Sequence, residues 1–212
     1  MVFSKTGRLR FLGQLDLGRT LDRALRRSGL PVRFSEGFHP RIRLSFPCAS
    51  PTGMASTCEL VEIQVRPPAG SSEVLEGLRE ALPPELAPLG AGDVPPGERV
   101  RLAAARYVVG VREGGPDLPD SRAVAALVDR REVPVLRRGK SVDLRPFVED
   151  LRREEGALRM RLAFAESGAT VRPEDVLGAL EVDPLAFRIE RTGMILRLRG
   201  SGAEERLEEH GT

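Results

Sequence analysis

The chain has 212 residues, 41% of them hydrophobic, with 33 basic and 31 acidic residues and a formal net charge of +2. This composition excludes a fibrous repeat or a disordered chain, and the length suffices for one large domain or two small ones. Residues 1–46 hold ten basic and three acidic residues, so a charge of +7 there stands against −5 in the remainder. We therefore predict a basic N-terminal module.

Lysine is rare, since only Lys5 and Lys140 occur among the 33 basic residues. The number of arginines therefore does not indicate phosphate binding by itself, and only their clustering does. The chain has no apolar run long enough to cross a bilayer, and the N-terminus lacks the apolar core of a signal peptide. We expect a cytoplasmic protein without a membrane partner.

The first elements follow from apolar spacing. Residues 2–5 predict a short strand, and Leu17, Leu21 and Leu25 recur every four residues in a helix expected over residues 14–28. Arg19, Arg23, Arg26 and Arg27 then share one stripe on the polar side of that helix.

Counted from the strand at residues 2–5, the first half has the order βαββα, completed by a short strand. The predicted strands cover residues 31–35, 41–46 and 59–65, with a loop at 36–40, a helix from residue 71 to 82 and a short strand near 86–89. Within 41–46, Ile42, Leu44 and Phe46 face one side and Arg41, Arg43 and Ser45 the other. This order is that of a ferredoxin-like split βαβ unit.

Residues 90–100 are rich in proline and glycine and predict a linker. The second half repeats the pattern, with helices expected at 121–130 and 173–180 and strands at 106–111, 133–136, 141–151 and 158–165. The strands 141–151 and 158–165 should form a hairpin around residues 154–156, and 187–199 is expected as a strand or a hairpin. We predict an α+β protein of two ferredoxin-like units with antiparallel sheets. The domains are expected at 1–92 and 101–200, followed by an acidic flexible tail at 201–212.

The stretch from Arg33 to Arg43 joins arginines, aromatic residues, a glycine and a histidine. We expect a phosphate-binding or nucleic-acid-binding surface here, with Phe38 or Phe34 stacking on a base. The alternative is that both aromatic side chains belong to the core. The predicted phosphate contacts are Lys5, Arg8, Arg10, Arg19, Arg23, Arg41 and Arg43.

His39 and Asp16 are the candidate catalytic residues, as a general acid or base. Asp16 equally fits an acid that stabilises the start of a helix. Cys48 and Cys58 are too few for a four-ligand zinc site or a three-cysteine cluster, so we expect no metal site and no structural disulfide. The Lys5–Gly7 region lacks the spacing of a Walker phosphate loop.

The basic module also resembles a known family. The segments that carry the resemblance are residues 3–12 (FSKTGRLRFL), 15–19, 23–31 (RALRRSGLP), 34–41 (FSEGFHPR) and 44–46, with weaker matches at 143–146 and 189–192. They are similar to the radical-SAM-linked bacterial protein family, a domain of unknown function.

The resemblance implies a companion of radical SAM chemistry and suggests an RNA substrate. S-adenosylmethionine and an iron–sulfur cluster would then come from a partner, with no cofactor in this chain. The family usually has Ser-His where Gly13-Gln14 stands here, which puts a role through position 14 in doubt.

We therefore expect an RNA-binding or substrate-presenting accessory protein to a radical SAM enzyme that is not catalytic alone. One alternative is a metal-independent RNA-processing enzyme that uses His39. Another is a module that docks a radical SAM enzyme through its acidic second half.

Overall fold

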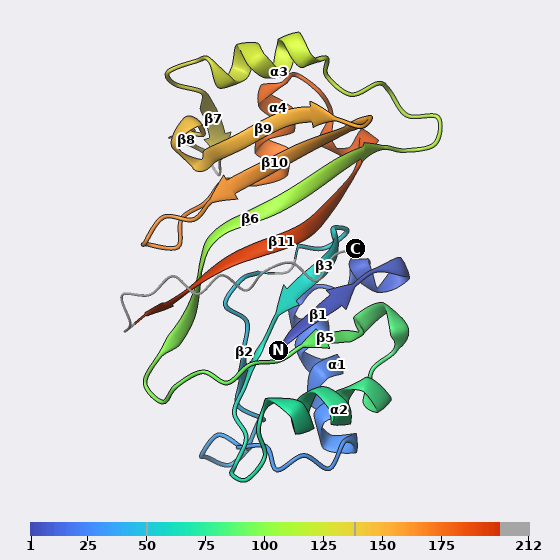
Figure 1. The fold of residues 1–212 in the computed structure, drawn as a ribbon, viewed down its shortest axis with the longest axis vertical. Helices are drawn as coiled ribbons and strands as arrows, with labels where there is room; N and C mark the ends of the chain where they lie inside the picture. Colours follow the sequence, from blue (N-terminus) through green and yellow to red (C-terminus); the bar gives the residue numbers. More distant parts are fainter. Residues whose placement is uncertain (50, 138, 200–212) are drawn as a thin grey trace. The chain divides into compact units, whose positions relative to one another are not determined.

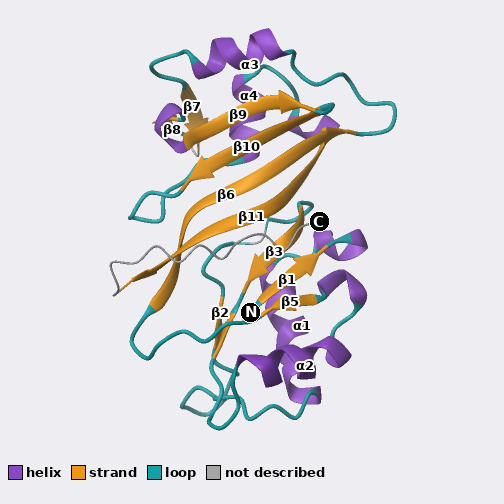
Figure 2. Ribbon diagram, viewed as in Figure 1, coloured by secondary structure: helices purple, strands orange, loops and turns teal. Residues whose placement is uncertain are grey.

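A computed structural model describes residues 1–49, 51–137 and 139–199. The chain divides into two compact units, one mainly Met1–Arg101 and the other mainly Leu102–Arg197, which are described separately. It is a mixed helix and strand protein with mostly antiparallel pairing and four α-helices in the described residues, so this part of the prediction is confirmed (Figures 1 and 2). The domain boundaries stay a prediction, and the predicted acidic tail lies outside the described residues.

The first unit contains two α-helices, two 3-10 helices and five strands in its described part. In chain order these are β1 (Val2–Lys5), η1 (Gly7–Phe11), α1 (Gln14–Arg27), β2 (Leu44–Ser45), β3 (Ala55–Leu60), β4 (Glu62–Ile63), α2 (Ser71–Ala81), η2 (Pro84–Leu86) and β5 (Pro88–Gly90).

Helix α1 forms where the leucine spacing predicts it. Leu17, Leu21 and Leu25 are at most 1% exposed and share one helix face. The helix ends at Arg27, and Gly29 follows with a φ of +70°, a conformation that glycine adopts without strain. The predicted helix is thus confirmed, and its opposite face carries the arginine stripe.

The helices pack on a small antiparallel sheet in which β1 lies between β5 and β3. Phe3 of β1 is fully buried in one core with Leu21 of α1 and Leu78 of α2. Figure 1 shows α1 and α2 together against this part of the chain. Because both helices bury their apolar faces on the same side of the sheet, the polar side of α1 is left for solvent.

The strands between α1 and β3 are shorter than predicted. The segment 31–35 is reduced to isolated bridges, Val32 with Val65 and Phe34 with Ile42, and β2 keeps only two residues of the expected 41–46. Pro40 and Pro47 flank this stretch. They lack the N–H that a continuous ladder needs, which limits the pairing.

The second unit contains two α-helices, two 3-10 helices and six strands in its described part. In chain order these are β6 (Arg99–Val111), α3 (Ser121–Val128), β7 (Pro134–Arg137), β8 (Lys140–Asp143), η3 (Arg145–Phe147), β9 (Val148–Glu154), β10 (Ala157–Ala163), α4 (Pro173–Ala179), η4 (Pro184–Ala186) and β11 (Phe187–Arg199). Within this unit the larger sheet has the order β11-β6-β10-β9 (Figure 2).

The predicted hairpin of the second unit is confirmed as β9 and β10, which turn at Glu155 and Gly156. Two boundaries differ from the prediction. The expected strand 141–151 is divided into β8 and β9 by η3, which contains a proline. Strand β6 begins at Arg99, inside the expected linker, where half-buried Val100 stands between exposed Arg99 and Arg101.

In the described ranges, no helix has both the length and the apolar character needed to cross a membrane.

Candidate functional site

Residues 32–43 fold back on themselves as a short antiparallel ribbon. Arg43 donates its backbone N–H to the carbonyl of Arg33 at 2.8 Å, and Ser35 donates to the carbonyl of Arg41 at 2.7 Å. Between these bonds, Phe34 and Ile42 form a bridge. We call residues 32–43 the basic ribbon.

The basic ribbon has an apolar side and a charged side. Ile42 is 6% exposed and belongs to the core of the first unit, which fixes the ribbon on α1. Side chains alternate along a strand, and directly paired residues share a face. Arg33, Arg41 and Arg43 therefore lie together on the opposite side, where all three are exposed.

The surroundings of these three arginines leave their charge uncompensated. In residues 1–49, 51–137 and 139–199, none of the three forms an ion pair or a side-chain hydrogen bond. Guanidinium groups prefer carboxylate or phosphate oxygens, which they bind in a forked geometry. The ribbon therefore presents three arginine donors to a ligand from solution.

The loop at the tip of the ribbon is entirely exposed and carries Gly37, Phe38 and His39. Gly37 has a φ of +114°, a conformation that residues with a side chain rarely adopt. Phe38 has a relative exposure of 102%. The turn at Gly37 thus places a large apolar ring in solvent next to the arginine face.

The structure separates the two aromatic candidates for stacking. Phe34 is 38% exposed, and the guanidinium of Arg26 lies over its ring at 5.4 Å from the centroid. Phe38 has no such partner among the described residues. Phe34 is therefore held in place by its surroundings, while Phe38 is open.

The polar stripe of α1 is partly compensated. Arg19 pairs with Asp16 at 2.9 Å, and Arg23 donates to the hydroxyl of Thr20 at 3.3 Å. Asp22 binds Arg26 at 2.7 Å through a hydrogen bond and charge attraction that raise the pKa of that guanidinium. Of the predicted contacts on this helix, Arg23 alone is without an ion pair in the part of the chain that the structure describes.

Arg8 and Arg10 lie on η1, just before α1. Arg10 donates to the carbonyl of Gly7 at 3.0 Å and covers the ring of Phe11 at 4.6 Å, while Arg8 is exposed. These two arginines therefore lie near the start of α1.

Lys5 does not lie on this surface. Its side chain is fully buried, and its Nζ donates to the carbonyl of Pro51 at 2.7 Å. A buried ammonium group bonded to the backbone is not open to a phosphate. Of the other six predicted residues Arg10 is half-buried, and the remaining five are exposed, as Arg33 is.

Arg33 belongs to this surface although it is not among the expected phosphate contacts. The sequence does contain its signal, because a hairpin centred on the loop 36–40 aligns Arg33 with Arg43. The alternation of residues 41–46 places charged side chains on one face of that strand. The partner strand across the loop shares this face.

The two catalytic candidates lie at different ends of α1. Asp16 is in its first turn, whereas the ribbon that carries His39 contacts the helix at Arg26 through Phe34. Ten residues of helix advance by about 15 Å. In the described residues, His39 is exposed and has no hydrogen-bond partner. The structure does not bring Asp16 and His39 together.

Cys48 and Cys58 are both half-buried, and no disulfide joins them. No group of three or more His, Cys, Asp or Glu side chains in residues 1–49, 51–137 and 139–199 has the geometry to hold a metal ion. Cys58 lies 3.8 Å from the hydroxyl of Ser56.

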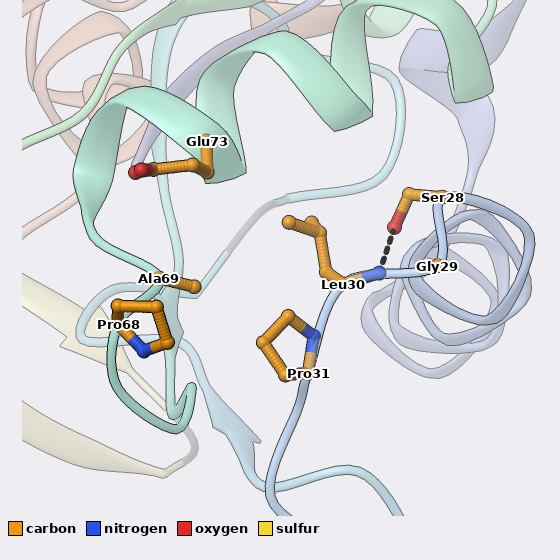
Figure 3. Close-up of a pocket in the computed structure, with 7 residues that line it drawn as sticks. All are labelled: Ser28, Gly29, Leu30, Pro31, Pro68, Ala69 and Glu73. Carbon is orange, nitrogen blue, oxygen red and sulfur yellow. Dashed lines mark hydrogen bonds between the residues drawn. The ribbon is translucent and has the colours of Figure 1, made fainter.

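A shallow hollow of about 300 Å³ lies between the end of α1 and the start of α2 (Figure 3). Its lining is mainly apolar, with Leu30 and Pro31 on one side, Pro68 and Ala69 on the other, and Glu73 on the helix that borders it. The backbone N–H of Leu30 donates to the hydroxyl of Ser28 at 3.4 Å, which shapes one wall. The hollow holds none of the predicted contact residues.

The chain is similar to a known protein family. A family model described as "Uncharacterized protein conserved in bacteria (DUF2344)" matches residues 1–173. No curated protein and no solved structure matches the chain. The match includes the whole basic ribbon and α1, and nothing in it refers to radical SAM enzymes.

Proposed function

The chain belongs to the bacterial DUF2344 family, and we propose that it is an RNA-binding protein whose contact surface is the basic ribbon. The observation that carries the proposal is the set of three exposed arginines, Arg33, Arg41 and Arg43, on one face without acidic partners among the described residues. Arg23 and Arg8 extend the positive surface along α1 and η1.

Charge and geometry both support a phosphate-rich ligand. Residues 1–46 carry a net charge of +7, while the rest of the chain carries −5. Phosphate oxygens on a nucleic-acid backbone suit guanidinium donors, and each contact releases counterions, which makes affinity fall with salt. The open ring of Phe38 supplies a base contact that a simple phosphate site would not need.

The test is a titration of a fluorescent structured RNA at two salt concentrations. The wild type is compared with Arg41→Ala/Arg43→Ala and with a charge-matched control, Arg130→Ala/Arg131→Ala, whose arginines are exposed in the second unit. The loss of two phosphate contacts lowers the slope of log affinity against log salt by about 1.5 and weakens binding by about 30-fold near 0.1 M salt. The control binds as the wild type does.

Equal binding isotherms for Arg41→Ala/Arg43→Ala and the wild type would exclude the basic ribbon as the RNA contact surface. A nucleoside triphosphate is titrated in parallel, because a small-anion site would lose affinity in the same variant. Competition of RNA by equimolar nucleotide would redirect the proposal to a phosphorylated small molecule.

We further propose that the protein acts as an accessory to a radical SAM enzyme and does not catalyse a reaction alone. The sequence resemblance over residues 2–63 supports this role, and S-adenosylmethionine and the iron–sulfur cluster would belong to that partner. Co-purification with a radical SAM enzyme of the same cell tests it. Retention of RNA binding without any association with such an enzyme would leave the RNA proposal standing and end this one. A cytoplasmic location belongs to the same proposal.

We also propose that the first unit has the ferredoxin-like split βαβ arrangement. Its support is the position of β1 between β5 and β3, with α1 and α2 on one side. Backbone NOEs between Phe3 and both Pro88 and Glu59 test the pairing.

A further inference from the structure

Three of the five phenylalanines in the first unit, Phe11, Phe34 and Phe38, are exposed, at 57%, 38% and 102%. A single exposed apolar side chain is ordinary on a protein surface, so exposure alone does not indicate a contact. The three rings are not equivalent, and their surroundings decide which of them remains open to a ligand.

Phe11 and Phe34 each have an arginine over the ring, Arg10 at 4.6 Å and Arg26 at 5.4 Å. A guanidinium on one face occupies the position that a stacked base would take. Phe38 has neither an arginine nor a core residue against its ring in the described part of the chain. Both of its faces are therefore available.

Phe38 lies close in the chain to the arginines that are proposed to contact phosphates. It lies three residues from Arg41 and five from Arg43, at the tip of the ribbon that presents those arginines. A ligand held by the arginine face extends past the ring. On the premise of the proposed function, we infer that the basic ribbon recognises unpaired nucleotides, with a base stacked on Phe38 and the flanking phosphates on Arg41 and Arg43.

The inference specifies single strands because of how bases are arranged. In a duplex each base is stacked on its neighbours, so its face is closed to a side chain. In a loop or a single strand, aromatic side chains stack on the base face with little sequence preference. The ribbon should therefore bind a single strand better than a duplex of the same strand.

The experiment uses the absence of tryptophan from the chain. Phe38→Trp introduces the sole tryptophan at the proposed stacking position, and Leu185→Trp, at a site 81% exposed in the second unit, is the matched control. Titration with a short oligouridine should quench the fluorescence of Phe38→Trp in a saturable way and leave that of Leu185→Trp unchanged. The same strand annealed to oligoadenosine should bind more weakly and quench little.

Affinity measurements on full-length variants complete the test. Phe38→Leu keeps an apolar side chain but loses the ring, and it should bind oligouridine about 5-fold to 100-fold more weakly. Phe38→Tyr keeps the ring and should bind as the wild type does. Because Phe38 is fully exposed, Phe38→Trp, Phe38→Leu and Phe38→Tyr should all unfold at the wild-type temperature.

Failure of this inference differs from failure of the proposed function. Unchanged affinity of Phe38→Leu, or equal binding of single strand and duplex, overturns the stacking assignment while Arg41→Ala/Arg43→Ala still loses salt-dependent binding. If that arginine variant also binds as the wild type does, the RNA proposal itself is overturned.

Discussion

The basic ribbon of the first unit and the β9–β10 hairpin of the second are both antiparallel and both rich in arginine, but their arginines have different surroundings. In the hairpin, Arg159 pairs with Glu154 at 3.1 Å and with Glu155 at 3.0 Å, and Arg161 pairs with Glu149 at 2.5 Å. In the ribbon, the three arginines have no acidic partner in the residues described.

The presence of arginine therefore does not identify a binding surface in this chain; the absence of an acidic partner does. Arginine accounts for 31 of the 33 basic residues, so almost any positive charge on the protein is an arginine, whether it binds a ligand or not. The arginines of the hairpin bind carboxylates of the same hairpin, so little positive electrostatic potential remains to attract an anionic ligand. The ribbon leaves the same groups uncompensated, and a ligand can bind there without displacing an internal partner.

The largest expected effect concerns the core beneath the β9–β10 hairpin. Leu158 of β10 is fully buried, so Leu158→Ala leaves a cavity and should lower the free energy of unfolding by about 2–5 kcal/mol. Urea denaturation measures the change. Leu136→Ala, the same substitution at a site 78% exposed, should cost less than about 0.5 kcal/mol. Similar costs at both sites would show that the hairpin is not anchored in this core.

Elements with strong periodicity could be predicted from the sequence. Helix α1 follows from its leucine spacing, and the turn of the β9–β10 hairpin follows from Glu155-Gly156. The range 187–199, expected as a strand or a hairpin, is the single strand β11. Strand lengths in the ribbon could not be predicted, because a strand needs a partner along its backbone as well as alternating side chains. Val32 and Phe34 alternate correctly, yet each makes a single bridge.

The candidate site could be predicted in part. Charge clustering placed Arg41 and Arg43 on one face, and the structure places them there. Local sequence offers no reason to expect that Lys5 is buried, because the Pro51 carbonyl that its Nζ contacts lies 46 residues away in the chain. The choice between Phe34 and Phe38 also required the fold, since it depends on the position of Arg26.

A smaller effect is expected at the helix starts of the two units. Helix α3 is capped by Asp120, which accepts from the N–H of Ala123 at 2.7 Å, whereas α1 begins after Gly13 with no side-chain cap. Asp120→Ala should cost about 1 kcal/mol of stability. Gly13→Ser should add a few tenths of a kcal/mol, because a Cβ added at that position would meet only the Thr52 hydroxyl, at 3.7 Å. Thermal unfolding of both variants measures whether stability falls in Asp120→Ala and rises in Gly13→Ser. A loss of stability in Gly13→Ser would contradict the extended backbone geometry at that position.

The paired and open arginines should differ modestly in their effect on stability. Arg159→Ala removes two partly exposed ion pairs and should cost about 0.2–1 kcal/mol, less at high salt. Arg41→Ala breaks no ion pair among the described residues and should change stability by less than about 0.5 kcal/mol at any salt. Urea denaturation at low and high salt measures both. A salt-dependent loss of stability on Arg41→Ala would reveal an internal partner and weaken the case for an open ribbon.

The smallest effect concerns the carboxylates at the starts of α2 and α4. Glu73 accepts from the N–H of Gly70 at 3.0 Å, as Asp175 accepts from that of Arg172 at 2.7 Å, but Asp175 also pairs with Arg137. Hydrogen bonds from its own backbone N–H and from that of Gly70 lower the pKa of Glu73 below 4.5.

A lowered pKa means that the folded state favours ionised Glu73. Its contribution to stability is present above the ordinary carboxyl pKa and is lost as the pH falls through the lowered value. Glu73→Gln should therefore be slightly less stable than the wild type at neutral pH, and the two stabilities should converge as the pH falls through the lowered pKa of Glu73. Glu76→Gln, an exposed change on the same helix away from its first turn, is the control. A difference between Glu73→Gln and the wild type that persists at low pH would mean that the side chain stabilises α2 through packing, because the charge of Glu73 is absent under those conditions.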